Sequence, residues 1–433
     1  MNASRGSYAT EIPMLDLRRH YALIREEVLA AIERVCSSQS FILGAEVEAL
    51  ESEIAAFVGA KHAVGCASGT DALWLALVAG GIKPGDKVVT TPLTFFATGS
   101  SIVRAGAEPV FVDVDPQTLN LDPQKVIDQL AARGKSRSPL DSLPSVGRSG
   151  QALDFTGRSA SGSSSFARDD NAKEHARRGT AGIKAILPVH LYGQCADMTA
   201  LQQIADEHRL ILIEDAAQAI GAKWKNKEAG SMGISAAFSF YPSKNLGAYG
   251  DAGMVTTNDT ALGDHMRRLR NHGSPERYLH TEFGWNARMD GIQAAVLRVK
   301  LKHIEEWNQR RREHAETYGR LLEAAGLISG ASGAPVRILH RSPDAVHVFH
   351  QYVLRVQRRD ELRKFLADRG IGSEVYYPIP LHLQPAFAYL GYKGGDLPEA
   401  ERASKDVLAL PIFPELTVEE QRRVVAGIAE FYS

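Results

Sequence analysis

The sequence predicts an α/β protein with a large three-layer αβα domain, a mostly parallel seven-stranded sheet and a smaller C-terminal α+β domain. Short apolar runs alternate with helical patterns over the first part of the chain, which is typical of a parallel sheet covered by helices. A chain of 433 residues is too long for one core, and its apolar content of 44% is ample for two. We expect an N-terminal tail over 1–11, a large domain over 12–303 and a small domain over 304–433.

The first elements are two helices, over 17–37 and 45–57. Apolar residues at roughly helical spacing, such as Val28, Ile32 and Val35, predict the first of them. Seven apolar runs then predict strands, at 62–67, 87–92, 109–114, 185–190, 210–215, 236–241 and 253–257. The intervening helices are expected at 72–79, 98–105, 122–132 and 198–208. Ligands of such sheets bind at the carboxyl ends of the strands.

The C-terminal part has a different pattern. One long helix is expected over 290–325, followed by a strand at 350–356, a helix at 360–369 and a strand at 371–377. A last helix over 417–432 begins with a capping-box signature, in which Thr417 precedes Glu420 by three residues.

The segment 134–182 does not fit this alternation. It is rich in Ser, Arg and Gly, lacks periodicity, and lies where a short loop is expected between a helix and a strand. We interpret it as a disordered surface insertion. A role of its basic residues in binding a partner stays open as an alternative.

Composition restricts the classes of partner. A formal net charge of -1 gives no reason to expect nucleic acid or an anionic membrane. The 3 cysteines are too few and too scattered for a disulfide framework or a metal cluster. No stretch approaches the ~20 apolar residues of a membrane span, and the first residues lack the apolar core of a signal peptide. We expect a soluble, cytoplasmic protein without a metal site.

Asp215 and Lys244 are the most informative pair. Asp215 ends one predicted strand, and Lys244 follows the next one along the chain. A pyridoxal phosphate site requires such a pair, because the lysine amine forms a Schiff base and the carboxylate keeps the pyridine nitrogen protonated. Taken alone, the two residues are better explained by a buried salt bridge, or by an unrelated Asp and a surface Lys, and the case for a cofactor site depends on the residues that accompany them.

Other residues at the strand ends could complete such a site. Gly69 and Thr70 open a helix after a small-residue turn, where free N–H groups favour phosphate. Phe95 could lie flat on a pyridine ring, Gln218 could bond the cofactor's phenolic oxygen, and Ser239 could reach the phosphate. Two of these features have a plainer explanation: a capped helix start without a ligand for the turn at Gly69 and Thr70, and a core position for Phe95.

Together these residues resemble the DegT/DnrJ/EryC1/StrS family of sugar aminotransferases, within fold-type I of the pyridoxal phosphate enzymes. The resemblance continues over nearly the whole chain, in the segments Asn271-His272-Gly273, Gly284-Trp285-Asn286-Ala287-Arg288-Met289-Asp290, Tyr376-Tyr377-Pro378-Ile379-Pro380-Leu381-His382-Leu383-Gln384-Pro385 and Leu410-Pro411-Ile412-Phe413-Pro414. The insertion 134–182 is the departure from the family pattern.

The resemblance implies a role for each matching residue of the cofactor site. Lys244 is the Schiff-base lysine and proton shuttle, and Asp215 pairs with the pyridinium. Phe95 stacks on the ring and Gln218 contacts its edge. The residues that bind the phosphate are Gly69, Thr70 and Ser239.

It also implies a homodimer with shared active sites, because Asn286 of the family reaches the phosphate of the neighbouring subunit. Read in isolation, Asn286 would be a loop or capping residue. Tyr376, Tyr377 and His382 match the segment that closes over the sugar, and Arg288 is a candidate to hold the donor's carboxylate.

The implied reaction is amino transfer from L-glutamate to a nucleotide-linked keto-sugar. The segment around Tyr376 resembles members that aminate C3 of a dTDP-linked 3-keto-6-deoxyhexose, and C4 amination or a UDP-linked sugar stays open. Members that do not transaminate carry His in place of the lysine, so Lys244 argues against them. A non-catalytic regulatory protein that binds the cofactor is the alternative from another class.

Overall fold

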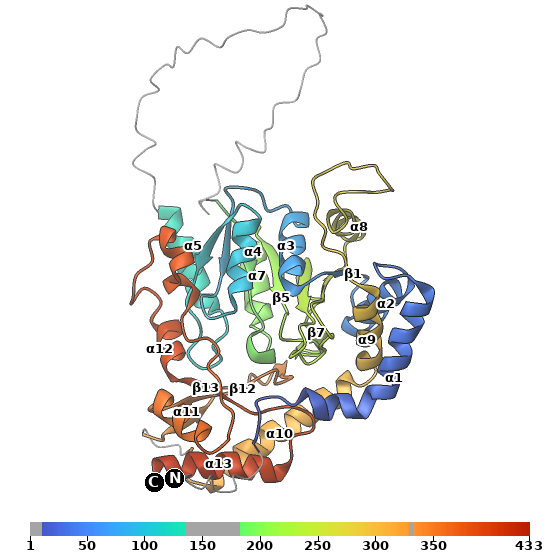
Figure 1. Ribbon diagram of the computed structural model, residues 1–433. Coiled ribbons are helices and arrows are strands. Elements are labelled where there is room, and N and C mark those ends of the chain that lie inside the picture. Colours follow the sequence, from blue (N-terminus) through green and yellow to red (C-terminus); the bar gives the residue numbers. More distant parts are fainter. Residues whose placement is uncertain (1–10, 136–181, 329–332) are drawn as a thin grey trace, which may run out of the picture.

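The computed structural model describes residues 11–135, 182–328 and 333–433. The predicted insertion 134–182 lies almost wholly outside these ranges. One core lies mainly in the part before residue 304 and another mainly in the C-terminal part, although residues of each part, such as Ile12 and Val348, contribute to the core of the other. Figure 1 shows the two parts as an upper unit around the large sheet and a lower unit that holds β12 and β13. The boundary at 303/304 falls where one helix ends and the next begins.

A seven-stranded sheet runs through the large unit, as the sequence predicts. Its strands, in spatial order, are β1 (His62–Cys66), β9 (Gly253–Thr257), β8 (Ser235–Ser239), β5 (Ile211–Asp215), β4 (Ile183–Leu187), β2 (Lys87–Thr90) and β3 (Glu108–Phe111). Strand β9 pairs antiparallel with both neighbours, and the other pairs are parallel. The carboxyl ends of β5 and β8 therefore open at one edge.

Helices cover both faces of the sheet. One face packs against α3 (Gly69–Ala79), α4 (Phe96–Arg104) and α8 (Thr260–Leu269). The other packs against α1 (Leu17–Ser38), α2 (Ala45–Val58), α5 (Pro123–Lys135), α7 (Met198–His208) and α9 (Gly291–Leu301). This arrangement confirms the three-layer architecture.

The single long helix expected over 290–325 is wrong. The chain forms α9 and then α10 (Ile304–Ala324), with a break at Lys302 and His303. α9 buries Ala294 and Val296 in the large-unit core, and α10 begins in that same core with Ile304 and Trp307. Further along, α10 buries Ala315 and Tyr318 in the C-terminal core. A straight continuation of α9 would keep its apolar stripe facing the large unit, so the helix axis changes direction at the break.

The C-terminal unit contains an antiparallel sheet in the order β10 (Val336–Ile338), β12 (Tyr352–Val356), β13 (Val407–Leu410). Around it lie α11 (Arg359–Ala367), α12 (Pro398–Asp406) and α13 (Val418–Tyr432). The capping box of Thr417 and Glu420 is present at the start of α13. The strand expected over 371–377 is wrong. The segment lies beside the edge strand β13 but pairs with it only at Glu374, opposite Ala409, while Ile371 pairs with Ile12 instead.

Shorter elements complete the chain: a small sheet of β11 (Ala345–Val346), β6 (Lys223–Trp224) and β7 (Lys227–Glu228), and the 3-10 turns η2 (Leu191–Gly193), η3 (Leu381–Leu383) and η4 (Pro385–Leu390).

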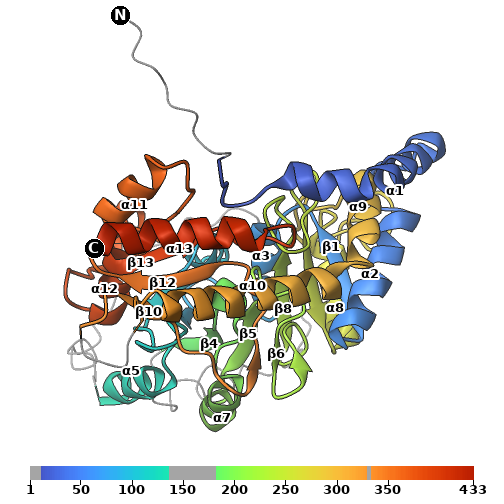
Figure 2. The same ribbon diagram turned by 90° about the horizontal axis from the view of Figure 1, so that it is seen from below.

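The first described residues belong to the core of the C-terminal unit. Ile12 is buried there, its N–H donates to the carbonyl of Gly370 at 2.8 Å, and its carbonyl accepts from Gly372 at 2.8 Å. Figure 2 shows this segment reaching the C-terminal unit before α1 begins. Residue 12, which the sequence assigns to the large domain, therefore packs against the other one.

Among the helices of the described ranges, none is long and apolar enough to cross a membrane. Within the same residues, no cluster of His, Cys, Asp and Glu is arranged to hold a metal ion.

Candidate functional site

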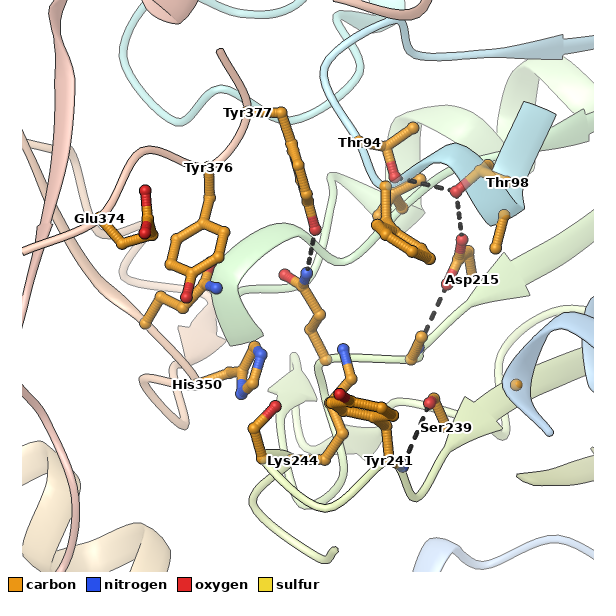
Figure 3. Close-up of a pocket in the computed structure, with 18 of the residues that line it drawn as sticks. Thr94, Thr98, Asp215, Ser239, Tyr241, Lys244, His350, Glu374, Tyr376 and Tyr377 are labelled. Carbon is orange, nitrogen blue, oxygen red and sulfur yellow. Dashed lines mark hydrogen bonds between the residues drawn. The ribbon is translucent and has the colours of Figure 1, made fainter. Parts of the chain in front are cut away.

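A cavity of about 760 Å³ lies where the carboxyl ends of β5 and β8 face the C-terminal unit. Its walls come from both units, and it contains Lys244 and Asp215 (Figure 3). The fold thus brings Lys244 and Asp215, which the sequence places at two strand ends, to the lining of one cavity.

Lys244 follows β8, and its backbone N–H donates to the carbonyl of Tyr241 at 2.8 Å, closing a turn. Among the residues that the structure describes, its amine has no hydrogen-bond or ion-pair partner. Burial lowers the pKa of this amine to about 8, and the charge of Asp215 acts in the opposite direction. Roughly a tenth of the amine is therefore uncharged at pH 7, far more than for an ordinary lysine, and the uncharged form is the one that acts as a nucleophile or base.

Asp215 is the last residue of β5 and is buried. Its Oδ2 accepts a hydrogen bond from the Thr98 hydroxyl at 2.7 Å, and its Oδ1 accepts from the N–H of Ala217 at 3.2 Å. Burial raises the pKa of Asp215, and the hydrogen bond from Thr98 is the largest opposing influence. Thr98 in turn contacts Thr94 at 2.8 Å. Because Thr98 donates to the carboxylate, Thr94 donates to Thr98.

A cradle of small residues lies at the start of α3. Ser68 caps the helix through its side chain, which accepts from the N–H of Asp71, and the N–H groups of Gly69 and Thr70 point out of the first turn without intrahelical acceptors. A Cβ atom on Gly69 would lie 2.5 Å from the Cβ of Ser239, so only glycine fits there. Free N–H groups, hydroxyls and a helix N-terminus together suit a phosphate group.

Phe95 precedes α4 and exposes 59% of its surface into the cavity region. Its ring centroid lies 6.2 Å from that of Tyr377. The neighbouring Phe96 packs on Phe387 at 5.4 Å. Phe95 is therefore available to stack on a planar ligand.

Gln218 connects the two units across the cavity. Its Oε1 accepts from the N–H of Tyr192 at 2.6 Å, and its Nε2 donates to the hydroxyl of Tyr377 at 3.0 Å (Figure 3). The sequence places Gln218 against a ring edge, and the structure adds that it holds Tyr377.

Three residues named from the sequence lie outside this cavity. Asn286 is exposed, and Arg288 donates to Asn271 at 3.2 Å. His382 is buried beside Glu401, with 3.1 Å between its Nε2 and the carboxylate. The assigned roles of these three residues stay predictions.

Sequence reasoning missed several residues that line the cavity. They are Met14, Leu15, Thr94, Thr98, Tyr241, Asp251, Arg311, His350, Gln351 and Glu374. Thr98 could have been found, because it stands on the strand-to-helix turn that carries Phe95. The others come from segments far apart in the chain, which only the tertiary fold brings together.

These groups fit pyridoxal phosphate. The cradle at Gly69 matches its phosphate, the amine without a partner matches its aldehyde, and Asp215 matches its ring nitrogen. The aldehyde and the ring nitrogen lie at different positions of one small ring, and Lys244 and Asp215 line the same cavity.

The comparisons with known proteins show the family to which the chain belongs. The model of the DegT/DnrJ/EryC1/StrS aminotransferase family matches residues 22–136 and 169–429. The unmatched interval falls within the Ser-, Arg- and Gly-rich segment that the sequence marks as a departure from the family.

Three similar proteins are informative. A "Pleiotropic regulatory protein" of Geobacillus stearothermophilus is 47% identical over 97% of this chain and 98% of its own length. A "dTDP-3-amino-3,4,6-trideoxy-alpha-D-glucose transaminase" of Streptomyces venezuelae is 39% identical over 97% of this chain and 96% of its own. The crystal structure of S. venezuelae DesV superposes with a TM-score of 0.82 at 39% identity, covering 98% of this chain and 99% of that one. The protein is therefore an aminotransferase of the DegT/DnrJ/EryC1/StrS family.

Proposed function

We propose that this protein uses pyridoxal phosphate to move an amino group from L-glutamate to a nucleotide-linked keto-sugar. The observation that carries the proposal is the amine of Lys244, which has no partner among the described residues and shares a cavity with the buried carboxylate of Asp215. The family membership supports the reaction class.

Different residues of the cavity would bind different parts of the cofactor. Gly69, Thr70 and Ser239 would hold the phosphate, and Phe95 would cover one face of the ring. When bound, the cofactor supplies an aldehyde that condenses with amines and a ring that accepts electrons.

Two groups of the chain handle charge and protons. Asp215, held by Thr98, would keep a positive charge on the ring nitrogen. The Nζ of Lys244, once released, would take the proton from the substrate's α-carbon and later return it, because its pKa of about 8 lets it both accept and donate near neutral pH.

For the acceptor, we infer C3 of a dTDP-linked 3-keto-6-deoxyhexose, giving an amino sugar for a polysaccharide or a glycosylated metabolite. Support comes from the Streptomyces venezuelae relative, whose name specifies a 3-amino dTDP-sugar. Amination at C4, or of a UDP-linked sugar, is the alternative within the family.

We further infer a homodimer with shared sites. Asn286 and Arg288 lie outside the cavity of their own chain, next to a loop whose Tyr278 and Phe283 are 82% and 101% exposed. Such apolar exposure suits burial against a second copy, which would bring Asn286 and Arg288 to the partner's cavity. Mixing Lys244→Ala with Asn286→Ala subunits should restore activity, because a mixed dimer has one site without either lesion. No recovery after verified subunit exchange would contradict sharing.

The proposed function is tested by the absorbance of the protein with pyridoxal phosphate, before and after L-glutamate. A yellow band that bleaches to the amine form of the cofactor is the expected result. A band that does not change on addition of L-glutamate would overturn the proposed donor. The absence of a band would overturn the assignment of pyridoxal phosphate as the cofactor.

A regulatory function is the second candidate, because the 47% identical relative has a regulatory name. Bleaching of the band by L-glutamate, followed by recovery with a keto-sugar, would show turnover and decide for the enzyme. Cofactor binding without turnover of any amine would decide for the regulator.

A further inference from the structure

The first turn of α3, which holds Gly69 and Thr70, is tied to α4 at two points. The two helices lie side by side on one face of the sheet (Figure 1). The Ser101 hydroxyl donates to the carbonyl of Thr70 at 3.2 Å, and the Nη1 of Arg104 donates to the Oδ1 of Asp71 at 2.6 Å. Ser101 and Arg104 are three residues apart, so they lie on the same face of α4. This face of α4 therefore docks on the turn that would hold the phosphate.

The hydroxyl of Ser68 is already engaged within this turn. It accepts from the N–H of Asp71 at 3.1 Å and donates to the Oδ2 of the same residue at 2.8 Å. Ser68 therefore caps the helix, and its proton is not available to a ligand. The N–H groups of Gly69 and Thr70 and the hydroxyls of Thr70 and Ser239 remain as donors for a phosphate.

The charges around these donors do not by themselves favour a phosphate. Among the described residues that line the cavity, the Lys and Arg side chains are those of Lys244 and Arg311. Lys244 is the amine that would take the aldehyde, and Arg311 is bound to backbone carbonyls of the C-terminal unit. The carboxylate of Asp71 stands in the same helical turn as the free N–H groups, where its charge would repel a phosphate.

Arg104 compensates this carboxylate and is itself held in place by two indole rings. Its guanidinium lies 4.8 Å from the ring centroid of Trp74 and 5.7 Å from that of Trp285. Contact with aromatic rings is favourable for a guanidinium and restrains it beside Asp71. The side chains of Arg104 and Asp71 are 36% and 17% exposed, so water screens the pair only in part.

We propose that Arg104 is a positioning residue for the phosphate of the cofactor, and that it acts by neutralising Asp71. Asp71 fixes Ser68 as the helix cap, and Arg104 compensates the negative charge that Asp71 brings to this turn. The free N–H groups and the positive end of the helix dipole can then hold a doubly charged phosphate. This inference rests on the proposed function and adds to the cofactor site a residue that does not line the cavity.

The first test is a cycle of charge-removing variants, in which the affinity for pyridoxal phosphate is measured by absorbance titration. Arg104→Met keeps an unbranched side chain beside Trp74 but removes the charge, and the affinity should fall by about 5- to 20-fold because Asp71 is left uncompensated. Asp71→Asn keeps an oxygen for Ser68 and should bind the cofactor at least as tightly as the wild type.

The double variant distinguishes charge compensation from packing. When both charges are removed, the affinity should return to within about 3-fold of the wild type, because the repelling carboxylate is gone as well. If Arg104 only packed against its neighbours, the double variant would bind as weakly as Arg104→Met. That result would overturn the inference.

Pyridoxal, which lacks the phosphate, shows whether the effect acts through that group. It offers the same aldehyde to Lys244, so its affinity should be equal in the wild type and in Arg104→Met. An equal loss of affinity for pyridoxal and for pyridoxal phosphate would show a general disturbance of the site and would also overturn the inference.

The matched control is Arg267→Met on α8. Arg267 pairs with Asp264 at 3.2 Å, its side chain is 34% exposed, and neither residue lines the cavity. The affinity for pyridoxal phosphate should therefore be unchanged. A fall as large as that of Arg104→Met would mean that the loss of any such ion pair weakens cofactor binding, against the inference.

The outcomes separate this inference from the proposed function. If the wild-type protein forms no yellow band with pyridoxal phosphate, the assignment of the cofactor fails and this inference fails with it. If the band forms but L-glutamate does not bleach it, the proposed donor fails, whereas the affinities of the variants still decide the role of Arg104. Unchanged affinity in Arg104→Met would overturn this inference alone.

Discussion

The two walls of the cavity are built in different ways. The large-unit wall consists of strand ends and first helical turns, with Asp215 ending β5, Lys244 following β8 and Gly69 opening α3. The opposite wall consists of irregular segments of the C-terminal unit, around His350 and Glu374. This difference indicates a division of roles. The catalytic and cofactor-binding groups, which need fixed positions, lie at the ends of the rigid sheet, whereas the groups that would contact the substrate lie on loops, which vary more freely.

The largest effect is expected for Lys244→Ala, which tests whether the large-unit wall carries the catalytic amine. Activity should fall by more than about 10⁴-fold, because the nucleophile and the proton shuttle are lost together. The yellow band should be absent while the circular dichroism spectrum is unchanged. Retained transamination would show that the catalytic amine lies elsewhere.

Gly69→Ala tests whether the large-unit wall tolerates any added atom. The new methyl group would lie 2.5 Å from the Cβ of Ser239, and we expect cofactor affinity to fall by about 10- to 100-fold, in line with overpacking penalties of about 1–3 kcal/mol. Titration followed by absorbance measures it. Gly394→Ala is the matched control, because nothing lies within 4 Å of the added Cβ there. Equal affinities in the two variants would contradict the close fit.

Thr98→Val tests the support of Asp215. Burial raises the pKa of the carboxyl and the Thr98 hydroxyl lowers it, so losing the hydroxyl should raise this pKa further. The carboxylate is the active form, so activity falls as the pH drops through this pKa. The acidic arm of the pH–rate profile should therefore move to higher pH, while Thr98→Ser should keep the wild-type profile.

Tyr377→Phe should give the smallest change, and it tests whether a residue of the C-terminal wall affects sugar turnover without affecting cofactor affinity. It removes the hydrogen bond of 3.0 Å to Gln218, a neutral contact worth about 1 kcal/mol. We expect sugar turnover to fall about 3- to 5-fold, with the affinity for the cofactor unchanged in the absorbance titration. A larger loss of cofactor than of sugar turnover would place Tyr377 functionally on the large-unit wall.

The same contrast explains what could be predicted from the sequence. The seven strands were predicted because apolar runs of the right length alternate with helices, and Lys244 and Asp215 could be paired because strand ends meet at one edge. Helix and strand periodicities are local signals, and they were strong in the large unit.

The errors have physical causes as well. No Pro or Gly marks the break between α9 and α10, so the local sequence does not show that α10 leaves the large-unit core for the C-terminal one. The segment 371–377 has apolar residues at strand spacing, but it pairs with β13 at Glu374 alone, because Ile371 pairs with Ile12. His350 was missed as a cavity residue because only the tertiary fold places it there, next to Asn245 from a distant part of the chain.

The hydrogen bonds of Ile12 to Gly370 and Gly372 have a consequence for biosynthesis. On the ribosome, residue 12 emerges well before α13, which completes the unit that buries it. The segment around Ile12 must therefore wait, unpaired, while the more than 400 residues up to the end of α13 are made. Since Met14 and Leu15 line the cavity just after it, the active site is completed by residues that are synthesised long before their partners.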